Sequence, residues 1–410
     1  MALANDVFYD ATIRRYAAKK PKNFSINEMV KHSREPSKEN IISSAQFVAR
    51  QLPIRLAQRL YDMQALPWLM LQNPHIFRVF ELYTDAFERI RAFEGAVDSV
   101  ADNEAFCNVL STALTENLPV VELLGKGVRE VIQVVPLESL ALDSFLDKIL
   151  SSRINQRVMA EQHLTLRSPM NDDWRGVIHL KCSPHSRFLD SAARVTEQCI
   201  HHFSVAPRVE FDGDLDVKFP FIPNHLEYIA TELLKNSMRA TIEFHESSTG
   251  EVVMHPSELR PIKVTFHSGV RNLTIRISDA GGGVSQHAVD SGLSPAYVSV
   301  QLGSRDPLPA SVRGLLPGTL SADVFKYGVT TAAKDRAASS PAQAAENAKF
   351  NWDVKATTAA PLAGYGFGLP LARLYARHFG GDIVMVSMPG YGTETFLTLD
   401  TSGEFYKRSL

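Results

Sequence analysis

The hydrophobic period changes once along this chain, near Trp174, and this change limits what the chain can fold into. Before that point, apolar residues recur every three or four positions, which is typical of amphipathic helices. The clearest stretches are "NPHIFRVFELYTDAFERIRAF", "NLPVVELLGKGVREVIQ" and "ESLALDSFLDKILSSRINQRVMAEQH". Long helices joined by short polar links predict a helical bundle over residues 1–170.

Beyond this point, short segments alternate apolar and polar residues, which is typical of half-buried strands. Three hairpins are expected: one around Asp212-Gly213, one formed by "IKVTFHS" and "LTIRISD", and one formed by "DIVMVSM" and "TETFLTL". Two helices lie between them, one containing Glu232 and one beginning near Gly368. Hairpins interleaved with helices predict an α+β sandwich over residues 175–405, with one mixed sheet and its helices on a single face.

Residues 285–363 show little periodicity and include the low-complexity run "AAKDRAASSPAQAAENAK". A stretch of this length inside a domain is usually a lid or a disordered insert. Both readings stay open for this segment.

The composition excludes several classes of protein. The formal net charge is −2 without a block of one sign, so a nucleic-acid partner is not expected. No window approaches the ~18 uninterrupted apolar residues of a membrane span. Cys107, Cys182 and Cys199 form no CxxC pair, which indicates a reducing compartment and no zinc site. The first residues, "MALANDVFYDATIRRYAAKK", contain Asp6 and Asp10 and fit a mitochondrial presequence poorly, so we expect mature protein or a missing leader.

The stretch "ELLKNSMRAT", residues 232–241, places Glu232, Lys235, Asn236 and Arg239 along one stripe of a helix that otherwise consists of core residues. A solvated polar stripe is the simpler interpretation. However, Asn is a poor helix former in mid-helix. An amide oxygen of Asn236 that binds Mg²⁺, with Glu232 acting on a proton, would explain the pattern.

The segment "ISDAGGGV" ends a predicted strand at Asp279, and Gly281 and Gly283 follow within it. A glycine-rich strand exit is common. Consecutive glycines also leave a backbone that a ligand ring can approach closely. Asp279 is an acceptor suited to an exocyclic amine, so the segment predicts a binding site for an aromatic base.

Two further glycine segments follow. In "AGYGFGLPLAR", Gly364, Gly366 and Gly368 precede a helix, and free N–H groups at a helix N-terminus suit an anion such as triphosphate. In "GYGTETFL", Gly392-Thr393 makes a tight turn into the last strand. Each segment alone is weak evidence, because glycine loops and hairpin turns are frequent.

The order of these four segments resembles that of the GHKL ATPase superfamily, which includes gyrase, heat-shock chaperones, histidine kinases and mitochondrial protein kinases. Too little chain follows the third segment for the transducer domain of the gyrase and chaperone branches. The helical stretch "TENLPVVELLGKG" lacks the histidine of an autokinase.

The remaining branch is similar to this chain from about residue 8 to residue 400: the mitochondrial 2-oxoacid dehydrogenase kinases. "APRVEFDGDLDVKFPFIPNHLEYIATELLKNSMRATIEFH" looks like the branched-chain type, and "APLAGYGFGLPLARLYARHFGGDIVMVSMPGYGTETFLTL" is closer to the pyruvate type. "ARQLPIRLAQRLYDMQALPWLMLQNPHIFRVFELYTDAF" resembles the family's amino-terminal bundle. The mixed similarity leaves the target complex open.

The resemblance implies a GHKL (Bergerat-type) kinase domain behind a helical docking domain. It implies an ATP- and Mg²⁺-dependent protein serine kinase of the mitochondrial matrix. Its substrate would be the decarboxylating dehydrogenase subunit of a pyruvate or branched-chain 2-oxoacid dehydrogenase complex, which phosphorylation inactivates. It would dock on the lipoyl-bearing core subunit and form a homodimer through its sheet. K⁺ stays open as a further cofactor.

The resemblance also assigns roles to residues of this chain. Glu232 would be the catalytic base, Asn236 the magnesium ligand and Asp279 the partner of the adenine amine. The remaining positions implied in ATP binding are Lys235, Arg239, Gly281, Gly283, Thr330, Thr331, Gly364, Gly366, Gly368 and Thr393.

Two points stay open. Asn117, Leu118 and Pro119 stand where the family has a His followed by an acidic residue. This departure supports an alternative, an ATP-binding regulatory scaffold without phosphoryl transfer. In the bundle, a set of six apolar residues could form a slot for a lipoyl arm. The more common role of residues at this spacing is to fill the core. The set consists of Leu66, Trp68, Leu69, Met70, Leu71 and Phe77.

Overall fold

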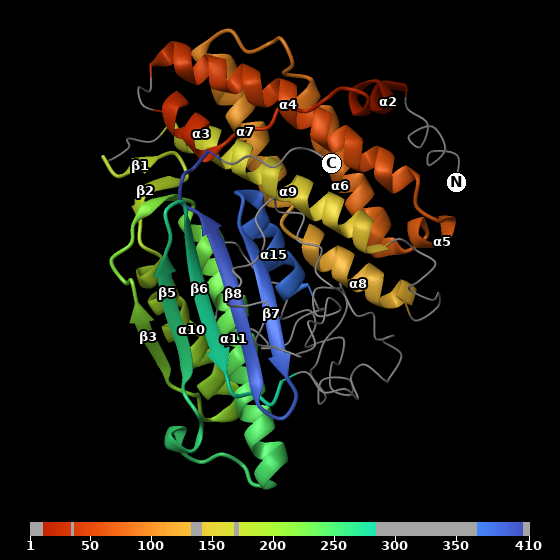
Figure 1. The fold of residues 1–410 in the computed structure, drawn as a ribbon. Helices are drawn as coiled ribbons and strands as arrows, with labels where there is room; N and C mark the ends of the chain where they lie inside the picture. Colours follow the sequence, from red (N-terminus) through yellow and green to blue (C-terminus); the bar gives the residue numbers. More distant parts are fainter. Residues whose placement is uncertain (1–10, 34–36, 133–141, 168–171, 284–366, 405–410) are drawn as a thin grey trace.

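The computed structural model describes residues 11–33, 37–132, 142–167, 172–283 and 367–404. The amino-terminal part is helical (Figure 1). Its helices are α2 (Ala11–Ala17), α3 (Ile26–His32), α4 (Lys38–Gln64), α5 (Trp68–Leu71), α6 (Pro74–Arg91), α7 (Val100–Glu116), α8 (Val120–Ile132) and α9 (Leu142–Thr165). The prediction of a helical bundle in this region is confirmed.

Local sequence explains where these helices begin. The Asn73 side chain accepts hydrogen bonds from the backbone N–H groups of His75 and Ile76, and Pro74 occupies the first turn of α6, where a missing N–H costs nothing. Ser99 and Asp102 form a reciprocal capping box at α7. The apolar residues predicted from the period of α6 are buried: Ile76, Val79, Phe80, Tyr83, Phe87 and Ile90.

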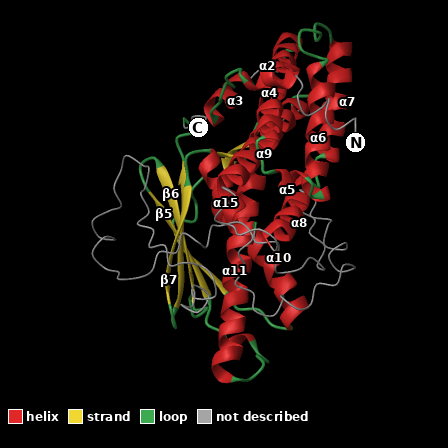
Figure 2. Ribbon diagram, turned by 90° about the vertical axis from the view of Figure 1, so that its right-hand side faces the viewer, coloured by secondary structure: helices red, strands yellow, loops and turns green. Residues whose placement is uncertain are grey.

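The carboxy-terminal part is a sheet covered by helices. Its elements are β1 (Trp174–Arg175), β2 (Ile178–Cys182), α10 (Pro184–Phe203), β3 (Val209–Gly213), β4 (Phe219–Phe221), α11 (Pro223–Thr249), the 3-10 helix η2 (Pro256–Glu258), β5 (Ile262–Ser268), β6 (Asn272–Asp279), α15 (Gly368–His378), β7 (Asp382–Met388) and β8 (Gly392–Asp400). Among the described residues, five strands form the main sheet in the order β3-β5-β6-β8-β7. Helices α10, α11 and α15 lie on one side of it (Figure 2), which confirms the predicted α+β sandwich.

Two of the three predicted hairpins are present. Strand β5 pairs antiparallel with β6, and β7 pairs antiparallel with β8. Strand β8 also pairs with β6, so β8 is an interior strand of the sheet. This arrangement brings the ends of β6 and the start of β8 together, with Asp279 opposite Thr393.

The hairpin predicted around Asp212-Gly213 is wrong. Strand β3 pairs in parallel with β5 instead, while β4 joins β2 in a separate small sheet of order β1-β2-β4. Gly213 has φ +90°, and the next residue, Asp214, donates its N–H to the carbonyl of Phe266. The chain therefore turns toward β5 rather than back along β3. Alternating hydrophobicity identifies a strand but not its partner, so the pattern alone does not distinguish these two pairings.

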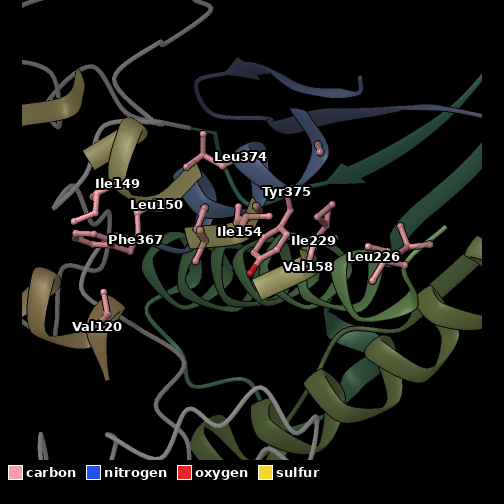
Figure 3. Packing of buried hydrophobic residues seen from close by; sticks show 14 of the residues in the cluster. Val120, Ile149, Leu150, Ile154, Val158, Leu226, Ile229, Phe367, Leu374 and Tyr375 are labelled. Atoms are coloured by element: carbon pink, nitrogen blue, oxygen red, sulfur yellow. The ribbon is translucent and has the colours of Figure 1, made fainter. Parts of the chain in front are cut away.

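The helical part and the sandwich share one continuous core. Figure 3 shows Tyr375 of α15 beside Ile154 and Val158 of α9 and Ile229 of α11. Tyr375 is 1% exposed. The helix that begins at the glycine segment is thus held directly against the amino-terminal bundle.

None of the described helices is both long and apolar enough to cross a membrane. The predicted lid or insert at 285–363 lies outside the described residues.

Candidate functional site

Helix α11 carries the polar stripe that the sequence singled out. Its first residue is Pro223, which tolerates the first turn because no N–H is needed there. It is followed by the C-cap residue Gly250, which adopts the left-handed conformation with φ +72°. Leu226, Ile229 and Leu233 are buried, as its helical period predicts. The helix therefore packs firmly into the core.

Glu232 and Lys235 form a buried ion pair on this helix. The Lys235 Nζ lies 2.6 Å from Glu232 Oε1, and the two residues are 9% and 4% exposed. The other carboxylate oxygen of Glu232, Oε2, lies against Gly368, the first residue of α15. The proposed base therefore sits where α11 meets the start of the glycine-segment helix.

Asn236 and Arg239 have different surroundings. Asn236 is half-buried, and no side chain or backbone group of the described residues hydrogen-bonds to its amide. The Arg239 Nε donates to Glu243 Oε1 at 2.8 Å, so this arginine pairs with an acid of its own helix. Lys235 likewise pairs with a helix acid, Glu232. Asn236 is thus the member of the stripe whose oxygen is left for a ligand.

Asp279 joins three parts of the chain. Its Oδ2 accepts a hydrogen bond from the Ser237 hydroxyl at 3.0 Å, and its Oδ1 accepts from the N–H groups of Gly281 at 3.0 Å and Thr393 at 3.1 Å. Burial raises the pKa of Asp279 above its ordinary value, while these hydrogen bonds oppose the rise. The carboxylate thus ties the end of β6 to α11 and to the start of β8.

The glycines after Asp279 have packing reasons of their own. A side chain at Gly281 would collide with Ala240 of α11, and Gly283 has φ +67° and lies against the backbone of Met388. The Thr393 hydroxyl lies 3.3 Å from the Ser387 hydroxyl. Close approach of α11 at Gly281 and of β7 at Gly283 therefore requires small residues here, and the prediction that Gly281 and Gly283 admit an adenine ring stays a prediction.

The start of α15 completes the site. Its N-cap residue, Phe367, has no side-chain oxygen to accept from the first N–H groups of the helix. The N-terminus of this helix of 11 residues therefore presents donors and the positive end of its dipole beside Glu232. Thr330, Thr331, Gly364 and Gly366 lie outside the described residues.

Sequence reasoning missed Ser237. This residue is 5% exposed, follows Asn236 directly and holds the carboxylate that we expected to contact adenine. A hydroxyl at a core position next to an unexplained asparagine was the available signal, because a buried polar group requires a partner.

Two further expectations concern the helical part. Asn117 ends α7, where its Nδ2 donates to the carbonyl of Ala113 at 2.8 Å, and its buried Oδ1 has no hydrogen-bond partner among the described residues. Met70 and Leu71 are buried, as the core interpretation predicts. Trp68 is 72% and Leu69 42% exposed, so these two remain available for a surface role.

Comparisons with known proteins agree with this geometry. Residues 23–179 match the family described as mitochondrial branched-chain alpha-ketoacid dehydrogenase kinase. Residues 222–403 match the family of histidine kinase-, DNA gyrase B- and HSP90-like ATPases.

The curated relatives are similar along almost the whole chain. A mitochondrial pyruvate dehydrogenase (acetyl-transferring) kinase of Arabidopsis thaliana is 30% identical over 395 residues, covering 96% of this chain and 94% of that protein. The mitochondrial isozyme 3 of Homo sapiens is 28% identical and covers 97% and 87%. A Drosophila melanogaster relative is also 28% identical, covering 86% and 76%. The chain therefore belongs to the mitochondrial 2-oxoacid dehydrogenase kinase family, whose members are protein kinases with a GHKL ATPase domain.

Proposed function

We propose that this chain phosphorylates a serine of the decarboxylating dehydrogenase subunit of a 2-oxoacid dehydrogenase complex, pyruvate or branched-chain, in the mitochondrial matrix. The observation that carries the proposal is the convergence at Asp279, where Ser237, Gly281 and Thr393 donate to one carboxylate. Phosphorylation would inactivate the dehydrogenase.

The described residues fit Mg-ATP. An ionised carboxylate offers about four acceptor sites. Three donors use three of them at Asp279, and the remaining site on Oδ2 suits the exocyclic amine of adenine. The start of α15 suits phosphate oxygens. Mg²⁺, when bound, neutralises phosphate charge, and Asn236 is the described side chain that would hold it.

Glu232 is the proposed base. Its Oε1 is held by Lys235, which leaves Oε2 to accept the proton of the substrate serine. As this proton moves to Oε2, the serine oxygen bonds to the γ-phosphorus, and the bond from that phosphorus to the β–γ bridging oxygen breaks to leave ADP. Positioning and charge neutralisation account for most of the rate in such transfers, and Glu232 adds proton transfer to them.

Membership of the family supports a proposal for the partners. We infer that residues 1–170 dock on the lipoyl-bearing core subunit, with the exposed Trp68 and Leu69 as part of the contact surface. Residues 175–405 form the kinase domain, and two copies associate through its sheet. K⁺ stays a prediction that none of the described contacts tests.

Radioactive transfer tests this function. Purified protein is incubated with Mg-[γ-³²P]ATP and, in separate reactions, pyruvate and branched-chain dehydrogenase subunits. We expect acid-stable phosphoserine on one of them. The Glu232→Gln variant should bind ATP normally and transfer on the order of 10²–10⁴-fold more slowly. Glu246→Gln, a change of the same kind near the carboxy-terminal end of the same helix, is the matched control.

Two results would contradict the proposal. ATP binding without phosphate on either subunit would favour the regulatory scaffold, for which Asn117 is the sequence argument. Loss of ATP binding in Glu232→Gln would make Glu232 a structural residue rather than a base.

A further inference from the structure

We propose that Lys235 and Gly368 are positioning residues that hold the Glu232 carboxylate at the N-terminus of α15. Lys235 would act through an ion pair, and Gly368 through the absence of a side chain. This inference rests on the proposed function. It changes the roles expected from sequence, in which both residues contact ATP.

The ion pair has no evident structural purpose. Lys and Glu are almost never fully buried unless they are paired. Removing two charges from water costs several kcal/mol for each ion, and apolar residues of similar size would often stabilise such a position equally well. The Arg239–Glu243 pair on the same helix shows the ordinary alternative, with its Glu243 carboxylate 31% exposed. A buried Glu232–Lys235 pair therefore indicates a carboxylate that is needed where it lies.

The contacts of Gly368 point to the same carboxylate. A Cβ at this position would overlap Glu232 Oε2 and lie 3.0 Å from its Cδ. Gly368 does not have a positive φ, so its backbone conformation accepts any residue. Among the described residues, the Glu232 side chain is what excludes a larger residue here. The third glycine of the segment thus provides space for the base.

Together, the two residues give the carboxylate oxygens separate surroundings. Oε1 lies 2.6 Å from the Lys235 ammonium group, and Oε2 lies against the first residue of α15. A carboxylate without these constraints could rotate and exchange its oxygens. Held in this way, Glu232 presents one oxygen, Oε2, on the side where the α15 N-terminus would bind phosphate.

Steady-state kinetics of Lys235→Met and Gly368→Ala test the inference. We expect kcat to fall roughly 10- to 100-fold in each variant, while the KM for ATP stays within about twofold, since an interaction that only orients the base affects transfer rather than binding. Lys235→Arg should recover much of the rate. Lys263→Met, on the exposed side of β5, should leave kcat unchanged. Circular dichroism and ATP affinity report whether each variant is folded.

A double variant separates positioning from general damage. Glu232→Asp shortens the base by one methylene, so it should restore part of the kcat lost in Gly368→Ala. If the two substitutions acted independently, their fold-losses in kcat would instead multiply. A raised KM for ATP at unchanged kcat in Lys235→Met would show a phosphate contact and overturn the inference, as would a fully active Gly368→Ala. A wild-type protein that transfers no phosphate would overturn the proposed function and this inference with it.

Discussion

Two polar clusters among the described residues, one in each half of the molecule, are built differently. In the helical half, the His163 ring is partnered on both nitrogens, by the Ser44 hydroxyl at 3.0 Å and by Asn103 Oδ1 at 3.0 Å, with Cys107 Sγ 3.5 Å away. His163 is 0% exposed. This cluster joins α4, α7 and α9 and is closed.

The cluster around Asp279 is open. Its carboxylate is half-buried, accepts from three donors and keeps one acceptor site, and the neighbouring Asn236 amide makes no hydrogen bond within the described residues. A polar network that serves the fold satisfies itself, because an unpaired buried group costs about 1–3 kcal/mol. The acceptor site left on Asp279 and the Asn236 amide are the groups that the proposed nucleotide and metal would use.

Among the changes that compare the two clusters, the largest expected effect is at Asn236. Asn236→Ala should remove the proposed magnesium ligand and lower the transfer rate roughly 10²- to 10³-fold, since electrostatic stabilisation of this kind contributes about 3–4 kcal/mol. Calorimetry with ATP in Mg²⁺ or in EDTA should show that only the metal-dependent affinity is lost. Asn155→Ala on α9 is the control. Full rate in Asn236→Ala would remove the metal role.

The closed cluster should respond to acid. Burial lowers the pKa of His163 to about 4, below its unfolded value near 6.5. The unfolded chain therefore binds more protons between these values, and stability is lost as the pH falls from about 6.5 toward 4. The loss should reach about 3 kcal/mol between pH 7 and pH 4. Urea unfolding across this range measures it.

His163→Gln should flatten this part of the pH dependence, whereas the exposed His201→Gln should not. His225 adds to the same trend in the sandwich, because burial places its pKa well below the ordinary value. An unchanged pH dependence in His163→Gln would show that the closed network tolerates a charged ring.

A subtler change tests the open cluster. In Asp279→Asn, one carbonyl oxygen can still accept from Gly281 and Thr393, so an NH₂ group replaces Oδ2. The new NH₂ group cannot accept a hydrogen bond from the adenine amine, but it can donate one to the 6-oxo group of inosine triphosphate. We expect the affinity ratio of ATP to inosine triphosphate to fall about tenfold, or about 1.4 kcal/mol. Equilibrium binding of both nucleotides measures the ratio, and an unchanged ratio would place adenine elsewhere.

The smallest effects compare the two clusters directly. Ser237→Ala removes one donor from Asp279 and should weaken ATP binding by about 1 kcal/mol, or roughly fivefold. Ser44→Ala removes one partner of His163 and should lower the stability by a similar amount while leaving ATP affinity unchanged. Paired melting and binding measurements on both variants decide the matter. The reverse pattern would contradict the distinction between the clusters.

Much of the fold followed from periodicity. The buried face of α6 and the hairpins β5–β6 and β7–β8 were predictable because their apolar patterns are local. The parallel pairing of β3 with β5 was not predictable, because β4, α11 and η2 separate the two strands in the chain. Alternation does not identify a distant partner.

The sequence pattern indicated candidate residues of the site but not the contacts between their side chains. Asn236, Asp279 and Thr393 stood out from their segments, and the structure brings Asp279 and Thr393 together. The pairing of Lys235 with Glu232 could not be read from spacing, because an i, i+3 pair on a polar stripe is equally suited to water. Whether the two side chains point toward each other or into solvent depends on the packing around the helix, which the spacing does not specify.

The packing of Tyr375 between α9 and α11 bears on any attempt to truncate the protein. An excised sandwich would expose Tyr375 to solvent, and an isolated bundle would expose Ile154 and Val158. Each such uncovering costs about 1.5–3 kcal/mol, a large fraction of the marginal stability of a domain. Fragments cut between the halves should therefore aggregate or melt early unless this seam is redesigned with polar residues.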